Sequence, residues 1–194
     1  MQNAELQNDR ILFCKGTHMR MPVKKLIIMA VLTAAALIIF IIEAQVPLPI
    51  PVPGVKLGLA NAVTLFALFY GRGAKQDTRG SVHLTTSDAF MILVCRIILG
   101  ALFTGRILAF FYSITGGLLG FAAQALVKRY VSVKQIWVCG AIGAIFHNVG
   151  QILAAIIVTG TPAIAAYLPI LIIAGVITGI VTGLVAQITL SRIR

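Results

Sequence analysis

Acidic residues are scarce in this chain of 194 residues, which has only five Asp and Glu against 16 Lys and Arg. They do not form the carboxylate cluster that holds Mg²⁺ on a diphosphate. A GxxxxGK[ST] phosphate loop is also missing, which excludes ATP hydrolysis by that mechanism. No Ser/His/Asp set is convincing, because Glu43 is the only acid inside an apolar segment. We therefore expect no enzymatic activity of the chain's own and no cofactor.

The three cysteines also give no indication of a metal or redox site. Cys14, Cys95 and Cys139 lie far apart and form no CxxC pair, so the sequence predicts neither a disulfide framework nor a zinc site. The net charge of +11 is compatible with nucleic-acid binding in principle. The basic residues, however, are not gathered on one element with interleaved aromatic residues. We expect no bound metal and no nucleic-acid partner.

Charge of either sign is rare, and apolar residues dominate. Charged residues make up 11% of the chain and hydrophobic residues 59%, whereas soluble domains carry roughly a quarter charged residues. Lipid is the solvent that suits such a chain. Six apolar segments follow one another, at residues 26–46, 57–70, 89–104, 107–127, 136–159 and 163–190. We predict an all-α polytopic membrane protein, a bundle of about six transmembrane helices.

The second segment, 57–70, is short for a membrane crossing, since roughly 20 helical residues are needed to cross the hydrocarbon. A tilted, re-entrant or partly buried helix is expected there, because such a helix is tolerated where protein covers it. The third segment, 89–104, is also short. The first, 26–46, resembles a signal peptide, but no small-residue cleavage site follows it, so we interpret it as a retained helix.

The basic residues indicate the topology. Most of them precede the first segment, lie between the second and third or the fourth and fifth, or end the chain, whereas Lys56 and Arg106 lie on the other side. The positive-inside rule then predicts that both termini are in the cytoplasm and that the protein spans the cytoplasmic membrane. We expect a basic cytoplasmic tail at 1–25, a single six-helix domain at 26–190 and a cytoplasmic tail at 191–194.

Glycines recur every four residues along the last segment, at Gly175, Gly179 and Gly183, and once along the fourth, at Gly116 and Gly120. This spacing clears one face of a helix, so that another helix backbone can approach closely. A second unusual segment has proline at every other position from Pro47 to Pro53. Its fixed φ angles predict an extended outer strap, either a tight connector or a lid over a pocket.

Polar residues inside apolar segments are the strongest functional signal, because they are costly in lipid and usually face the bundle interior. Arg96 lies in the third segment and requires an acid, for which Glu43 is the embedded candidate, a ring of carbonyl groups, water or an anionic ligand. In the fifth segment, His147 and Gln151 share a helix face and Asn148 lies beside them. These residues favour a ligand or ion site over a satisfied core, and Lys56 and Asn61 add polar groups at the strap's exit.

Four of these motifs resemble the Gx transporter family, whose members are often labelled heptaprenyl diphosphate synthase component I. They are the segment from Glu43 to Asn61, which contains the strap, Arg96-Ile-Ile-Leu-Gly100, Tyr112-Ser-Ile-Thr-Gly-Gly117 and His147-Asn148-Val-Gly150-Gln151. The resemblance covers roughly residues 26–190. That family is similar to the substrate-binding S components of energy-coupling factor (ECF) transporters. The resemblance implies six helices, cytoplasmic termini, an outer substrate pocket and a strap that acts as its lid.

The resemblance also implies a function. We expect a substrate-binding subunit for uptake of a vitamin, a flavin or an isoprenoid or quinone precursor, energised by a coupling membrane subunit and ATPase subunits. Small residues of the first helix, Ala30 and Ala34, would contact the coupling subunit. One alternative is a non-catalytic accessory component of heptaprenyl diphosphate synthesis, and another is a membrane scaffold of a flavin- or quinone-linked electron-transfer system. The predicted substrate-binding residues are Glu43, Lys56, Asn61, Arg96, His147, Asn148 and Gln151.

Overall fold

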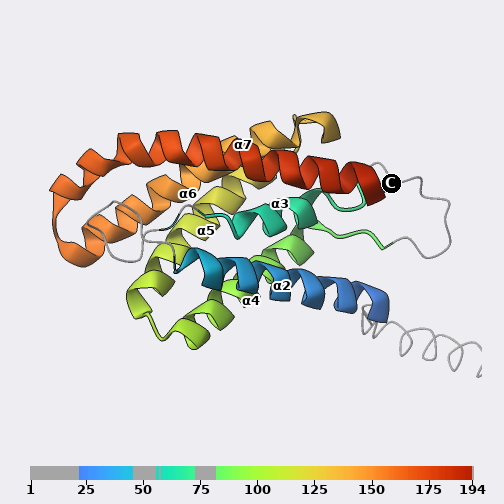
Figure 1. The fold of residues 1–194 in the computed structure, drawn as a ribbon, viewed down its shortest axis with the longest axis horizontal. Helices are drawn as coiled ribbons and strands as arrows, with labels where there is room; N and C mark the ends of the chain where they lie inside the picture. Colours follow the sequence, from blue (N-terminus) through green and yellow to red (C-terminus); the bar gives the residue numbers. More distant parts are fainter. Residues whose placement is uncertain (1–21, 46–55, 57, 73–81, 194) are drawn as a thin grey trace, which may run out of the picture.

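The computed structural model describes residues 22–45, 56, 58–72 and 82–193 (Figure 1). The α-helices are α2 (Val23–Glu43), α3 (Asn61–Phe69), α4 (Thr86–Thr104), α5 (Ile107–Val127), α6 (Ile136–Thr159) and α7 (Leu168–Ile193), and two short 3-10 helices are η1 (Val133–Gln135) and η2 (Pro162–Tyr167). No strand occurs within these ranges. The predicted all-α fold is confirmed.

Five of these helices are long and apolar enough to cross a membrane, and α3 is the exception. Its 9 residues rise only about 14 Å, less than half of the roughly 30 Å of hydrocarbon. It contacts the five other α-helices of the described residues and lies between α2 and α7 (Figure 1). Most of its side chains are buried, including Leu65, Leu68 and Phe69. Protein therefore surrounds the short helix, as the sequence predicted for this segment.

Small residues line the inside of the bundle and large apolar residues cover its outside. Along α7 the glycines are buried, at Gly175, Gly179 and Gly183. Ile173 and Ile177 of the same helix are 64% and 59% exposed. A Cβ at Gly179 would lie 2.6 Å from the carbonyl oxygen of Gly140 on α6. The predicted close approach of the last helix is confirmed, and the exposed isoleucines suit contact with lipid.

The glycine pair on α5 permits a second close approach. A Cβ at Gly116 would lie 2.8 Å from the His147 carbonyl oxygen, and one at Gly120 would lie 2.9 Å from the Gly143 carbonyl oxygen. Helix α6 is thus sandwiched between the glycine faces of α5 and α7. This packing places the His147 turn of α6 deep in the protein, where it is 3% exposed.

The start of α4 corrects the predicted boundary. The apolar pattern placed its start at residue 89, but the helix begins at Thr86 and its N-cap is Thr85. The Asp88 backbone N–H donates to Thr85 Oγ1 (3.3 Å), and Asp88 Oδ2 accepts from the Thr85 N–H (2.6 Å). Asp88 is thus the third residue of a capping box, which stabilises a polar first turn that hydropathy alone misses. Asp88 also forms a 2.7 Å salt bridge with Lys25 Nζ.

Two other boundaries also shift. Helix α2 spans Val23–Glu43 rather than residues 26–46, because its first turn takes in the two lysines that hydropathy excluded. The last apolar segment divides into η2 and α7, and Pro169 lies in the first turn of α7. Proline is compatible with that position, since the first N–H groups of a helix have no intrahelical partner.

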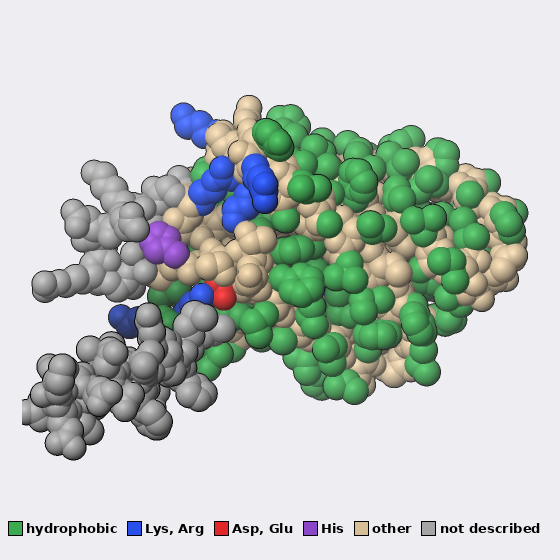
Figure 2. Space-filling view, turned by 180° about the vertical axis from the view of Figure 1, so that it is seen from behind, with side chains coloured by type: hydrophobic (Ala, Val, Ile, Leu, Met, Phe, Trp, Pro, Cys, Tyr) green, Lys and Arg blue, Asp and Glu red, His purple; other side chains and the backbone are tan. Residues whose placement is uncertain are grey.

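Basic side chains gather at one end of the bundle, and hydrophobic side chains cover most of the remaining visible face (Figure 2). Lys25 begins α2, Arg72 follows α3, Lys128 and Arg129 follow α5, and Arg192 lies in the last turn of α7. The antiparallel succession of helices explains why these positions meet at one end. This asymmetry agrees with the expected topology, and the cytoplasmic location of both termini stays a prediction.

Replacement of Gly179 by leucine is expected to destabilise the bundle. A side chain there collides with the α6 backbone at Gly140 and Ala141, and overpacking of this kind costs about 2 kcal/mol. In a protein of this size, that corresponds to a fall of about 4–8 °C in the thermal unfolding midpoint, measured in detergent. Val181→Leu is the matched control, because Val181 is 53% exposed on the same helix. Equal midpoints for both variants would contradict the close-packing assignment.

Candidate functional site

Five elements position the predicted substrate-binding residues. Glu43 ends α2, Lys56 precedes α3, Asn61 begins α3, Arg96 lies within α4, and His147, Asn148 and Gln151 belong to α6. All but Asn61 are buried. Six of the seven residues lie together, joined by hydrogen bonds within two groups and by contacts to shared neighbours. The seventh, Asn148, lies apart from them.

Gln151 connects the segment before α3 to the histidine of α6. The Lys56 backbone N–H donates to Gln151 Oε1 (3.2 Å), and Gln151 Nε2 lies 2.9 Å from His147 Nε2. Because a backbone N–H can only donate, the Gln151 oxygen must face Lys56 and its NH₂ group must face the histidine. His147 Nε2 therefore accepts, and the neutral ring carries its proton on Nδ1. The sequence placed these two side chains on one face of the helix, and their contact confirms it.

Gly58 brings the carboxylate of α2 close to the same histidine. Its backbone N–H donates to Glu43 Oε1 over 2.5 Å. Its φ angle is +80°, and a Cβ there would lie 2.8 Å from His147 Cδ2. Both the backbone conformation and the lack of space require glycine at this position. Glu43 and His147 thus both lie next to Gly58.

Two cations complete the group, and an aromatic ring that sequence reasoning missed lies beside both. Arg96 Nη2 donates to Asn61 Oδ1 (3.0 Å). Lys56 Nζ lies 3.3 Å from the Phe40 ring centroid, and the Arg96 guanidinium carbon lies 5.8 Å from it. A ring face attracts cations, most strongly where water is excluded. Phe40 could have been found from its position one helical turn before Glu43, but an apolar residue in an apolar helix carries no polar signal.

The group has an excess of positive charge. Lys56 and Arg96 are 7% and 3% exposed, and Glu43 is the one buried carboxylate beside them. The direct pair with Glu43, one of the alternatives for Arg96, does not form, since the one salt bridge in the described part of the chain joins Lys25 and Asp88. Arg96 Nε is buried and has no hydrogen-bond partner among the described residues. This arrangement can accept an anion, because a buried donor without a partner is costly. We call these six residues the polar network, namely Glu43, Lys56, Asn61, Arg96, His147 and Gln151.

Asn148 lies outside the polar network. Its Nδ2 donates to the Leu171 carbonyl oxygen of α7 over 2.5 Å, and the side chain is 0% exposed. A Cβ at Gly175 would collide with the same amide nitrogen. Asn148 therefore ties α6 to α7, whereas Gln151 contacts His147 and the segment before α3. Its neighbour His147 contacts Gln151 instead, and ligand binding by either residue stays a prediction.

Two predictions concern other parts of the molecule. Ala30 and Ala34 are exposed on α2, which contacts only α3 and α4 substantially among the described helices. Their contact with a coupling subunit stays a prediction. The predicted proline strap, at residues 47–53, lies outside the described residues.

Comparison with known proteins gives one family. The family model for heptaprenyl diphosphate synthase component I matches residues 32–189. This range contains the whole polar network and all six α-helices in whole or in large part. Searches of curated proteins and of solved structures gave no significant match.

Replacement of Gln151 by leucine is expected to destabilise the protein. The Lys56 N–H and the His147 ring nitrogen would both lose their partner, and each buried unsatisfied group costs about 1–3 kcal/mol. The thermal unfolding midpoint in detergent should fall by several degrees. Gln187→Leu is the matched control, because the buried Gln187 oxygen has no hydrogen-bond partner among the described residues. A smaller effect at Gln151 than at Gln187 would contradict the bridging role.

Lys56 is expected to make stability depend on pH in the alkaline range. Burial lowers the pKa of its ammonium group from 10.5 to about 8; Glu43 opposes this, and Arg96 reinforces it. The unfolded chain then binds more protons than the folded protein between these two values, so stability should rise as pH increases from about 8. Thermal unfolding midpoints measured from pH 7.5 to 9.5 test this against Lys56→Met. An unchanged slope in that variant would show that another group is responsible.

Proposed function

The chain belongs to the heptaprenyl diphosphate synthase component I family, and from this premise we propose that it is a non-catalytic membrane subunit that captures a small anionic molecule for uptake. A component of a larger enzyme or transporter needs partner subunits, and a multi-pass helical protein needs a bilayer. The cytoplasmic membrane is the proposed location, with both termini on the cytoplasmic side.

The observation that carries this proposal is the excess positive charge of the polar network. Two buried cations face one carboxylate, and Arg96 Nε has no partner among the described residues. Such a group does not stabilise the folded protein by itself, since a buried charge is costly unless it is paired. A carboxylate or phosphate of a ligand would balance Lys56 and Arg96. Gln151 and His147 would then supply directional hydrogen bonds to the rest of the molecule.

Access to the polar network has to be controlled, because it is closed in this structure. Three contacts hold the segment that leads into α3, namely Lys56 to Gln151, Gly58 to Glu43 and Asn61 to Arg96. We propose that release of this segment opens the site and that the ligand replaces some of these contacts. Energy for the cycle would come from partner ATPases through a coupling subunit that docks on the exposed face of α2, at Ala30 and Ala34.

One second function is favoured by a specific observation, the description of the matching family. In that role the chain would assist a separate prenyltransferase rather than transport a solute. The two roles differ in their partners. Purification in a mild detergent, followed by mass spectrometry of bound proteins and small molecules, separates them. ATPase subunits support uptake, whereas a soluble Asp-rich synthase without ATPase subunits would contradict it.

Arg96→Leu is expected to abolish binding of the small anion that copurifies with the unaltered protein. Loss of a charge-assisted hydrogen bond costs about 1.5–3 kcal/mol, which corresponds to at least a tenfold loss of affinity. Arg96→Lys keeps the charge and should retain part of the binding. Arg106→Leu is the matched control, since Arg106 is exposed. Mass spectrometry of the purified variants measures ligand retention, and detergent unfolding midpoints check folding. Full retention by a folded Arg96→Leu protein would refute the site assignment.

A further inference from the structure

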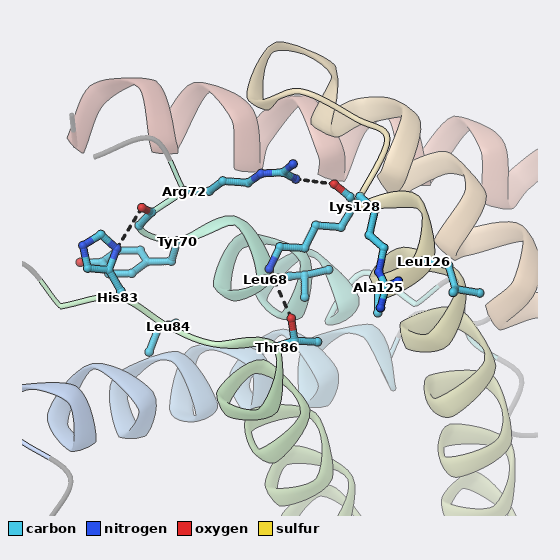
Figure 3. Close-up of a pocket in the computed structure, with 11 residues that line it drawn as sticks. Leu68, Tyr70, Arg72, His83, Leu84, Thr86, Ala125, Leu126 and Lys128 are labelled. Atoms are coloured by element: carbon cyan, nitrogen blue, oxygen red, sulfur yellow. Dashed lines mark hydrogen bonds between the residues drawn. The ribbon is translucent and has the colours of Figure 1, made fainter. Parts of the chain in front are cut away.

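A second polar site lies at the basic end of the bundle. A pocket of about 580 Å³ opens between the end of α3, the start of α4 and the end of α5 (Figure 3). Three cations line it, namely Arg72, Lys128 and Arg129. It is separate from the polar network, because Asn61 begins α3 at the network and Leu68 lines the pocket near the other end of the same helix.

Two of the three cations, Arg72 and Lys128, contact a backbone carbonyl and a hydroxyl group rather than acids. Arg72 Nη1 donates to the Lys128 carbonyl oxygen, and Lys128 Nζ lies 3.4 Å from Thr86 Oγ1, as Figure 3 shows. The Arg129 side chain is exposed and has no hydrogen bond or salt bridge among the described residues. Burial lowers the pKa of the Lys128 ammonium, and the nearby Arg72 lowers it further. A bound anion would oppose both effects.

Besides polar groups such as Thr86 and His83, the pocket has apolar lining residues, and one of them reaches the outer surface. Leu68 and Leu84 are buried at 1% and 6% exposure, whereas Leu126 is 62% exposed. A ligand here would find cations on one side and hydrocarbon on the other. That combination suits an amphiphile whose head is a phosphate and whose tail continues into the bilayer. Arginine and lysine side chains at a membrane boundary bind such head groups.

We propose that this pocket binds the phosphate head of an apolar-tailed molecule and that the side chains of Arg72, Lys128 and Arg129 contact the phosphate. Two sources share this chemistry, an anionic phospholipid and a prenyl diphosphate. The pocket does not depend on the proposed uptake function, since none of its residues belongs to the polar network.

The test uses the full chain in phosphatidylcholine nanodiscs and three phosphate probes. Inorganic diphosphate and farnesyl diphosphate are titrated by calorimetry, and phosphatidylglycerol is mixed into the discs and its retention measured by native mass spectrometry. The pocket variant is Arg72→Gln with Arg129→Gln. Its control is Lys24→Gln with Arg192→Gln, which removes the same charge from exposed residues outside the pocket at the same end. Arg129→Gln alone is included, because that side chain has no structural contact to lose.

At least one probe is expected to bind saturably to the unaltered chain. Its binding should be about tenfold weaker in the pocket variant and weaker also in Arg129→Gln. The control should change the affinity by less than twofold. Retention of phosphatidylglycerol alone identifies a phospholipid head group. Tighter binding of farnesyl diphosphate than of inorganic diphosphate identifies a prenyl diphosphate. The proposal is overturned if no probe binds, if the control loses as much affinity as the pocket variant, or if a folded Arg129→Gln protein binds every probe as the unaltered chain does.

Discussion

Inside a bilayer, a polar group can be satisfied only by another part of the protein, and this constraint organises the whole structure. The short helix α3 is possible because the five other helices cover it. Its first residue, Asn61, then meets Arg96 of α4, and the segment before it meets Gln151 of α6 and Glu43 of α2. The close approach of α5 to α6, which depends on Gly116 and Gly120, positions His147 for the same group. If any one of these helix contacts were lost, a charged or amide group would face hydrocarbon.

Helix α3 also relates the two candidate sites to each other. Asn61 at its start belongs to the polar network, and Leu68 near its end lines the basic pocket. The buried network holds its cations in the interior, where a single unbalanced charge is costly. The basic pocket holds its cations at the bundle end, where water and lipid head groups reduce that cost. The first arrangement therefore favours selection of one ligand, and the second favours association with a charged surface or head group.

Much of this could be predicted from the sequence, because lipid imposes simple patterns. Hydropathy located the helices, and the glycine spacing of α7 predicted that another helix backbone would approach it closely, which α6 does. The spacing of His147 and Gln151 predicted their shared face. Hydropathy failed at Thr86, where a capping box extends α4 into polar sequence. It also gave no reason to separate Asn148 from His147, since adjacent helical residues point about 100° apart and only the position of α7 decides which of them is buried against it. Phe40 and the basic pocket depend on tertiary packing and had no sequence signal of their own.

The closed polar network has a consequence for how a ligand could enter. Each hydrogen bond that holds the segment leading into α3 is made by a backbone N–H or a side-chain amide, at Lys56, Gly58 and Asn61. A ligand that supplied a carboxylate or phosphate oxygen to Arg96 would compete with Asn61, and one that bonded Gln151 would compete with the Lys56 backbone. Binding would thus weaken two of the three contacts that close the site. Differential contacts of this kind are what a ligand needs to shift a protein between two states. The same residues would then recognise the ligand and report its arrival to partner subunits.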